Sequence, residues 1–159
     1  TVAEMTARRE KEQAENLRRG QALAAAQTTK DGALIQAYLK KNKLIAKKTL
    51  GGTYYIVTRP GKGLPPKKGQ NVSVLYRGTI MGTGKEFDSS AKHGNTPITF
   101  PLGQGQVIPG WDQVLAVLTK GSKAILLIPS PLAYGPRSMG ADIPANSVLR
   151  FEVELVDFK

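Results

Sequence analysis

Residues 148–158 read VLRFEVELVDF, and their pattern indicates how the C-terminal part of the chain is built. Apolar residues alternate with charged ones, and the apolar set is Leu149, Phe151, Val153 and Leu155. Successive side chains of a strand point to opposite faces of a sheet, so this stretch predicts a strand with one buried and one solvated face. Strands of this kind are typical of antiparallel sheets.

Upstream of this stretch, from Gly51 and Gly52 onward, the apolar residues keep a period of two, and Gly and Pro separate the segments. The connections between most of the segments are too short for the crossover that parallel neighbours need. We therefore expect a mainly antiparallel sheet. Its further strands are predicted at TYYIVT (53–58), VSVLYRGTI (72–80), PITFPL (97–102) and SKAILLI (122–128).

The segment VIPGWDQVLAVL at 107–118 predicts one short helix over 111–118. Pro and Gly precede the helix, Asp112 lies in its first turn where the helix dipole favours an anion, and Lys120 and Gly121 follow its end. One helix against one face of an antiparallel sheet is an α+β arrangement.

The first fifty residues have a different composition. All ten prolines and 15 of the 17 glycines lie after residue 50, whereas the first fifty are rich in Ala, Glu, Gln, Lys and Arg, which favour helices. An interruption near 28–32 predicts two helices, over about 3–27 and 32–46, with Asp31 as N-cap of the second. We expect a two-helix extension over 1–50 and an α+β domain over 51–159.

This extension needs a surface to pack against. Leu34 and Tyr38 are four residues apart, as are Ile35 and Leu39, so an apolar face forms on the second predicted helix. Helices in proteins are stabilised mostly by burying such a face, either on the domain that follows or on a second copy of the chain. Of the two, we predict a homodimer through this arm.

Composition excludes several kinds of chemistry. The chain has no cysteine, which rules out disulfides and thiol chemistry, and its single histidine, His93, argues against a zinc site or a His-based triad. His93 lies among polar residues without a partner base, so we expect an exposed loop residue with no catalytic role. No metal or cofactor is expected. The longest apolar runs, such as AILLI at 124–128, are too short for a transmembrane segment.

The glycine loops and the net charge of +11 do not indicate a nucleotide or nucleic-acid site. MGTGKEFD at 81–88 lacks the spacing of a phosphate-binding loop and predicts a hairpin turn, and GQGQVIPG at 103–110 predicts a loop leading into the short helix. The charge is spread, with 11 Lys/Arg against 5 Asp/Glu in residues 1–50 and 12 against 7 in residues 51–159. No nucleic-acid partner is expected, since no aromatic residues interleave with a basic run.

Trp111 is the chain's only tryptophan, and by itself it is expected to be a core residue, because its ring buries a large apolar area. It belongs, however, to a set of apolar and aromatic residues near predicted loops. That set is Tyr76, Phe87, Phe100, Val107, Ile108, Trp111, Tyr134 and Phe151.

With their order along the chain, these residues resemble the FKBP-type peptidyl-prolyl cis-trans isomerases, the macrolide-binding immunophilins. The runs that carry the resemblance cover about 52–159 and read YRGTIMGTGKEFDSS, PITFPLGQGQVIPGWDQVL, IPSPLAYG and IPANSVLRFEVELVDF. The resemblance implies a half-open antiparallel sheet of five to six strands wrapped around the short helix, with the active cleft between them. It also implies proline-containing polypeptides as substrates and macrolides as ligands.

The resemblance assigns roles to individual residues. Trp111 would form the floor under the substrate proline ring, the Tyr134 hydroxyl and the Ile108 N–H would donate to substrate carbonyls, and Asp88 would lie beside the bound carbonyl. A simple turn role for Asp88 in Asp-Ser-Ser stays open. The walls would come from Tyr76, Phe87, Phe100, Val107, Ile108 and Phe151, with Ile143 as a further substrate-binding residue.

Three residues depart from the family's pattern, namely Ile98, Met139 and Asp142, and they bear on ligand affinity and sequence preference. The first fifty residues are similar to the helical extensions of bacterial members of the macrophage infectivity potentiator type, on the run AYLKKNKLIAKKT before the first strand. Those members dimerise through the extension and act in the periplasm or outside the cell. The similarity implies a homodimer and an exported location, with a cytoplasmic one still open.

The activity implied is rotation about the peptide bond before proline. Twisting that bond breaks amide resonance, and an apolar pocket favours the twisted state over the planar one without proton transfer. Two other classes stay open. One is a peptide-binding chaperone module on the same fold without turnover, and the other, from charge alone, is a nucleic-acid-associated protein.

Overall fold

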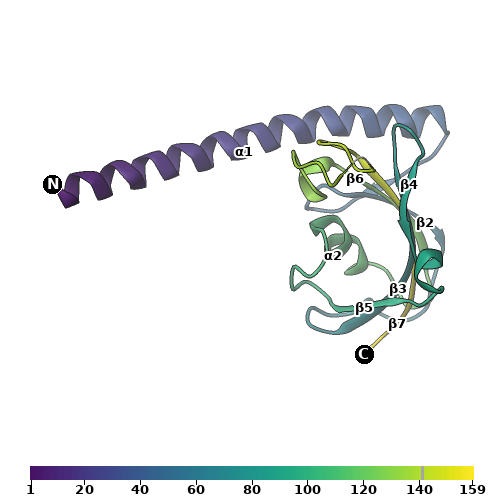
Figure 1. The fold of residues 1–159 in the computed structure, drawn as a ribbon. Helices are drawn as coiled ribbons and strands as arrows, with labels where there is room; N and C mark the ends of the chain where they lie inside the picture. Colours follow the sequence, from purple (N-terminus) through teal and green to yellow (C-terminus); the bar gives the residue numbers. More distant parts are fainter. Residues whose placement is uncertain (141) are drawn as a thin grey trace.

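A long helix and a strongly curved sheet make up the chain (Figure 1). The computed structural model describes residues 1–140 and 142–159. Helix α1 (Val2–Lys41) passes along one side of the sheet domain and then extends well beyond it, so that the N-terminus lies far from the C-terminus.

The sheet contains seven strands, and every pair of neighbours is antiparallel, which confirms the predicted architecture. Its order is β1-β2-β6-β7-β3-β4, and β5 pairs with the first residues of β3. Strands β1 and β4 were not predicted. The strands are β1 (Lys47–Lys48), β2 (Tyr54–Arg59), β3 (Asn71–Ile80), β4 (Glu86–Ser89), β5 (Ile98–Pro101), β6 (Lys123–Ile128) and β7 (Leu149–Phe158).

Strand β7 lies in the middle of the sheet, where it pairs with β6 on one side and β3 on the other. Its predicted apolar set is buried, and Phe151 lies opposite Gly78 of β3. A side chain at Gly78 would come within 2.6 Å of Phe87 and 2.7 Å of Phe151, so the glycine lets both rings pack over the strand.

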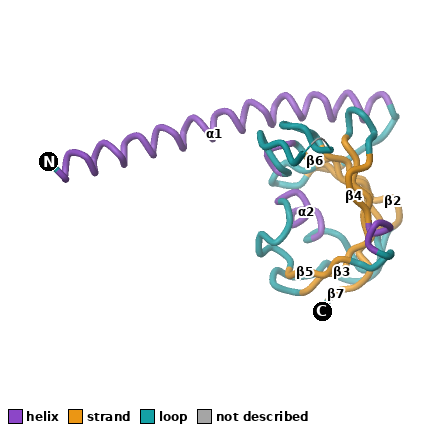
Figure 2. Tube along the Cα trace, in the orientation of Figure 1, coloured by secondary structure: helices purple, strands orange, loops and turns teal. Residues whose placement is uncertain are grey.

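Helix α2 (Pro109–Leu115) lies inside the curve of the sheet (Figures 1 and 2). It ends three residues before the predicted end at 118, and Trp111, Val114 and Leu115 are buried against the sheet. Asp112 in its first turn accepts the Gly103 N–H at 2.9 Å, which ties the preceding loop to the helix.

The N-terminal extension is one helix, which corrects the prediction of two helices over 3–27 and 32–46. Helix α1 runs without interruption through the predicted break. Thr28 and Thr29 at that point donate their hydroxyl protons to carbonyl oxygens one turn earlier. Threonine is disfavoured in helix interiors, but the hydroxyl groups of both threonines have hydrogen-bond partners within this helix.

Asp31 is correspondingly not an N-cap. It lies within α1 and is fully buried, and its carboxylate accepts hydrogen bonds from Ser130 in the sheet domain. The helix ends at Lys41, earlier than predicted, and its C-cap Asn42 donates its N–H to the Tyr38 carbonyl at 3.0 Å.

Only the C-terminal part of α1 packs on the sheet domain. Ile35 and Leu39 form a second core cluster with Tyr54, Leu127 and Val148. The apolar residues nearer the N-terminus are exposed, and they are Val2, Met5, Leu17 and Leu23. The predicted apolar face is therefore divided, since Ile35 and Leu39 are buried within the same chain and Leu34 stays 56% exposed.

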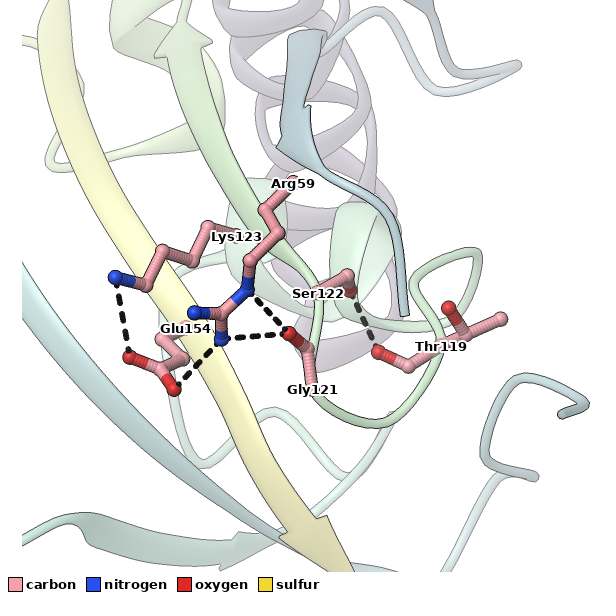
Figure 3. A network of polar contacts seen from close by, with 6 residues as sticks. All are labelled: Arg59, Thr119, Gly121, Ser122, Lys123 and Glu154. Carbon is pink, nitrogen blue, oxygen red and sulfur yellow. Dashed lines mark hydrogen bonds and ion pairs between the residues drawn. The ribbon is translucent and has the colours of Figure 1, made fainter. Parts of the chain in front are cut away.

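A polar network connects the end of β2 and the start of β6 to the middle of β7 (Figure 3). The Arg59 guanidinium donates to the Gly121 carbonyl at 2.8 and 3.1 Å and pairs with Glu154 at 3.0 Å. Lys123 lies 3.9 Å from the other oxygen of Glu154. Glu154 lies on the face of β7 opposite the buried Phe151, Val153 and Leu155, so these contacts leave the inner face of the sheet apolar.

In the described part of the chain, no helix has the length and apolar character that crossing a membrane requires.

Candidate active site

A pocket of about 190 Å³ opens between α2 and the inner face of the sheet. Strands β3, β4, β5 and β7, the loop before α2 and the loop after β6 all contribute side chains to it. The lining residues are Tyr76, Phe87, Asp88, Ile98, Gln106, Val107, Ile108, Trp111, Tyr134 and Phe151.

Trp111 lines this pocket and is 4% exposed. Tyr76 and Phe151 each meet its ring edge-on, with centroids 5.2 Å away, and Phe100 packs behind it at 6.0 Å. Its indole N–H is buried and has no hydrogen-bond partner among the described residues. Edge-on aromatic packing of this kind holds each ring in one orientation, so this apolar lining is rigid.

Asp88 of β4 is the acidic group of the pocket, and three donors surround its carboxylate. The Tyr76 hydroxyl donates at 2.7 Å, the Ser89 N–H donates at 2.8 Å, and His93 Nε2 lies 2.9 Å away. Burial alone would raise the pKa of Asp88, but the contacts with Tyr76, His93 and Ser89 hold it below the usual range. Asp88 is therefore ionised near neutral pH.

The pKa of Tyr76 is shifted upward, whereas that of Asp88 is lowered. Burial first, and then the neighbouring Asp88 carboxylate, raise the pKa of Tyr76 to about 12. The phenol therefore stays protonated and donates a hydrogen bond to Asp88. This bond orients the tyrosine ring that meets Trp111 edge-on.

The place of His93 differs from what was expected. The side chain is 62% exposed, but it lies at the end of the short 3₁₀ helix η1 (Ser90–His93) and contacts Asp88 of the pocket. The prediction of no partner was wrong, because the turn of η1 brings residues five apart in sequence together. The predicted lack of a catalytic role stays a prediction.

Tyr134 and Ile108 supply the two donor groups expected at the pocket. Tyr134 follows the short helix η2 (Ser130–Leu132), and burial first and Asp88 second raise the pKa of its phenol. Ile108 is the N-cap of α2; its carbonyl accepts the Trp111 N–H at 3.0 Å, while its own N–H makes no hydrogen bond to the described residues. Both groups are protonated donors beside an apolar cavity.

The structure brings together all the predicted site residues except Phe100 and Ile143, which lie in the surrounding core cluster rather than on the pocket wall. Two residues line the pocket without having been predicted to do so. Ile98 had been noted only as a departure from the family pattern, and Gln106 directly precedes the predicted Val107. The signal for Ile98 was its departure from the family pattern, and that for Gln106 was its position beside Val107.

A larger hollow of about 540 Å³ lies on the outer face of the sheet beside η1. Each of its charged side chains forms an ion pair, such as that of Arg77 with Glu86 at 2.8 Å and that of Glu152 with Arg150 at 3.0 Å. Within the described residues, no cluster of His, Cys, Asp or Glu is arranged to hold a metal ion. The smaller pocket is the candidate active site.

Comparisons with known proteins agree with this geometry. The profile of the FKBP-type peptidyl-prolyl cis-trans isomerase family matches residues 63–156. FK506-binding protein 2 of Candida glabrata is 52% identical over 96 residues, 60% of this chain and 68% of that protein. The FKBP-type peptidyl-prolyl cis-trans isomerase FkpA of Aeromonas hydrophila is 40% identical over 156 residues, 98% of this chain and 52% of that protein.

Among solved structures, that of FkpA from Escherichia coli superposes with a TM-score of 0.67 at 40% identity, covering 87% of this chain and 64% of that one. The chain thus spans about half the length of the Aeromonas relative. On the profile match, the identities and the shared fold, the chain belongs to the FKBP-type peptidyl-prolyl cis-trans isomerases.

Proposed function

We propose that this chain accelerates cis–trans isomerisation of peptide bonds before proline, with the proline ring seated on Trp111. The observation that carries the proposal is the aromatic lining of the pocket, where Tyr76 and Phe151 hold Trp111 edge-on beside Tyr134. A proline ring is apolar and compact, and such a lining would hold it while the preceding carbonyl turns.

The physical basis is differential binding of the twisted amide. The planar amide has a rotation barrier of about 20 kcal/mol, because twisting breaks its resonance. A twisted amide has less charge separation than a planar one, so an apolar cavity that excludes water stabilises it more. No group has to accept or release a proton in this step.

The polar groups at the rim have positional roles in this proposal. The Tyr134 hydroxyl and the Ile108 N–H would donate hydrogen bonds to substrate carbonyls and hold the residues on either side of the turning bond. Asp88 would act through Tyr76, whose hydroxyl it already accepts at 2.7 Å.

Turnover of a short X-Pro peptide by Phe151→Ala tests the pocket. This variant opens the wall beside Trp111 and admits water, and we expect turnover to fall strongly while the chain still folds. Phe158→Ala is the matched control, because it is the same truncation on the same strand and Phe158 does not line the pocket. Equal turnover in the two variants would contradict the assignment.

Holding of unfolded polypeptides, without turnover, is the alternative function on the same fold. The observation in its favour is the projecting part of α1, on which Met5, Leu17 and Leu23 are exposed. Suppression of aggregation of an unfolded protein should then disappear when residues 1–26 are removed. A chain that suppresses aggregation but does not turn over X-Pro peptides would favour this alternative.

The proposal includes a homodimer through α1, because Met5, Leu17 and Leu23 are apolar residues of the helix that the chain itself leaves exposed. Sedimentation should report a dimer for the full chain and a monomer for the double variant Leu17→Glu, Leu23→Glu. A monomeric full chain would contradict it.

An exported, periplasmic location and macrolide binding complete the proposal. The location is inferred from likeness to the bacterial FkpA proteins, and fractionation of cells that produce the native protein tests it. Macrolide binding is inferred from the relatives named FK506-binding proteins, and quenching of Trp111 fluorescence measures it directly.

A further inference from the structure

Asp31 is a buried carboxylate in a helix that is mostly exposed. It is 0% exposed, and its two oxygens are both engaged. Oδ2 accepts the Ser130 N–H at 2.8 Å and the Ser130 hydroxyl, and Oδ1 accepts the Gln27 side-chain amide at 2.8 Å. Burying a charge is costly unless it is fully hydrogen-bonded, so this contact fixes the two elements firmly relative to each other.

Ser130 is in turn the anchor of the loop that carries Tyr134. Its carbonyl oxygen accepts the N–H of Ala133 at 3.0 Å and that of Gly135 at 2.8 Å, which are the residues on either side of Tyr134. Ser130 therefore connects Asp31, through its N–H and hydroxyl, to the turn around Tyr134, through its carbonyl.

The turn is also held by a bond from the Leu132 N–H to the Pro129 carbonyl at 2.9 Å and by packing on the core cluster, but Ser130 is its link to α1. Pro129 and Pro131 flank Ser130 and carry no N–H, so the Ser130 N–H is the backbone donor available at that point, and it points to α1. Asn146 closes the far side by donating its N–H to the Gly135 carbonyl at 2.9 Å. Removing Asp31 would leave two buried donors of Ser130 without an acceptor and release the near side of the turn.

We propose that Asp31 is a positioning residue for the isomerase site, because it holds Ser130 and thereby sets the place of the Tyr134 hydroxyl at the pocket. The inference rests on the proposed function, in which Tyr134 donates to the substrate. It makes the C-terminal part of α1 a component of the site, although no α1 residue lines the pocket.

A double-mutant cycle between Asp31 and Tyr134 tests this. Asp31→Ala should lower kcat for an X-Pro peptide roughly two- to tenfold, as expected for loss of one hydrogen bond in the transition state. In a Tyr134→Phe background the same change should add little, because the hydroxyl it positions is already gone. Asp31→Asn, which keeps the shape and one acceptor oxygen, should recover part of the loss.

Glu12→Ala is the matched control, since it removes an exposed carboxylate from the same helix, and kcat should be unchanged. Unfolding followed by Trp111 fluorescence shows whether each variant is folded. If Asp31→Ala does not fold, Ser130→Ala, which removes only the hydroxyl, replaces it in the cycle. Equal fold-losses in the presence and absence of the Tyr134 hydroxyl would mean that Asp31 only fastens the helix, and would overturn the proposal.

A second readout separates this proposal from the proposed function. In a chain with labelled tyrosine, the Tyr134 ring resonances should shift in Asp31→Asn and stay in place in Glu12→Ala. Shifted resonances in a chain without X-Pro turnover would uphold the positioning contact and overturn the isomerase assignment. Unshifted resonances would overturn the positioning contact whatever the turnover.

Discussion

The two ends of helix α1 have similar helix-forming sequences and very different surroundings. Toward the N-terminus Leu17 and Leu23 are 63% and 72% exposed, whereas toward the C-terminus Asp31, Ile35 and Leu39 are buried at intervals of four residues. Helix propensity makes the whole segment helical, but burial occurs only where the sheet domain offers Tyr54, Leu127 and Val148 and the loop at Ser130. We refer to residues 2–26 as the outer half of α1 and to residues 27–41 as the inner half.

The two halves of α1 therefore differ in their relation to the sheet domain. The inner half completes a core cluster of the domain and contacts the loop of the candidate site, while the outer half presents an uncovered surface. The expectation that residues 51–159 fold and catalyse alone stays a prediction. Removing residues 1–50 should nevertheless lower the stability of the domain, because it removes the inner half.

Truncation at two points gives the largest expected effect. At a concentration where the full chain is monomeric, removal of residues 1–26 should leave the free energy of unfolding unchanged. Removal of residues 1–50 should lower it by several kcal/mol, since burial of Ile35 and Leu39 is worth about 1.5–3 kcal/mol each. Denaturant unfolding of the two truncated chains measures the difference.

X-Pro turnover should survive both truncations, because Trp111 and its neighbours belong to a separate core cluster. Removal of residues 1–50 also removes Asp31, so it should lower kcat about as much as Asp31→Ala does, whereas removal of residues 1–26 should leave kcat unchanged. Two truncated chains of equal stability would show that the inner half is not part of the domain core.

A smaller effect is expected from one substitution made at two positions of α1. Leu39→Ala removes a buried side chain and should cost about 2–5 kcal/mol. Leu23→Ala changes an exposed side chain, and its cost in the monomer should stay within about 0.5 kcal/mol. Thermal or urea unfolding at a concentration where the chain is monomeric compares them, and a reversed order would refute the division of the helix.

The pH dependence of stability is a third test, and it should be the same with and without the outer half. The pKa of Asp88 is lowered in the folded chain, so its contribution to stability is present above the ordinary aspartate pKa of about 3.9 and is lost as the pH falls through the lowered value. The stability difference between the natural chain and Asp88→Asn should therefore be largest near neutral pH and shrink in acid. A difference that grew in acid would mean that the carboxylate is not held in its charged form.

Turnover itself should be nearly flat between about pH 6 and 8, where Asp88 is ionised and Tyr76, with its pKa of about 12, is protonated. His93→Ala is the informative variant, because His93 contacts Asp88 and histidine is the side chain that changes charge in this range. A single titration near neutral pH that disappeared in His93→Ala would make His93 catalytic.

The smallest effect is expected at the hydroxyl that the inner half is proposed to position. Tyr134→Phe should cost about 0.5–1.5 kcal/mol in kcat/KM, the net value of one neutral hydrogen bond. Removal of the outer half should not change this cost. Steady-state turnover of X-Pro peptides with and without residues 1–26 measures both, and an unaffected Tyr134→Phe would remove the hydroxyl from the mechanism.

Much of the fold could be predicted because its signals are local. The alternation in 148–158 and the Gly and Pro boundaries located five of the strands, and Pro109-Gly110 located the start of α2 to within two residues, since the helix begins at Pro109 rather than Trp111. The pocket residues followed from the resemblance to a family, and the structure brings most of them to one cavity. Strand β4 was missed because residues 86–89 are too few to show a period.

What the sequence by itself determined is thus the periodicity of each segment and the residue types available for a pocket. The tertiary structure alone decided which polar groups meet. The pairing of Asp88 with His93 depends on the turn of η1, and that of Asp31 with Ser130 joins residues 99 apart. The continuity of α1 through residues 28–32 has the same origin. Local helix propensity slightly favours a break at these residues, and burial of the inner half against the domain outweighs that preference. No local sequence pattern reports this burial, because it depends on contacts with residues distant in sequence.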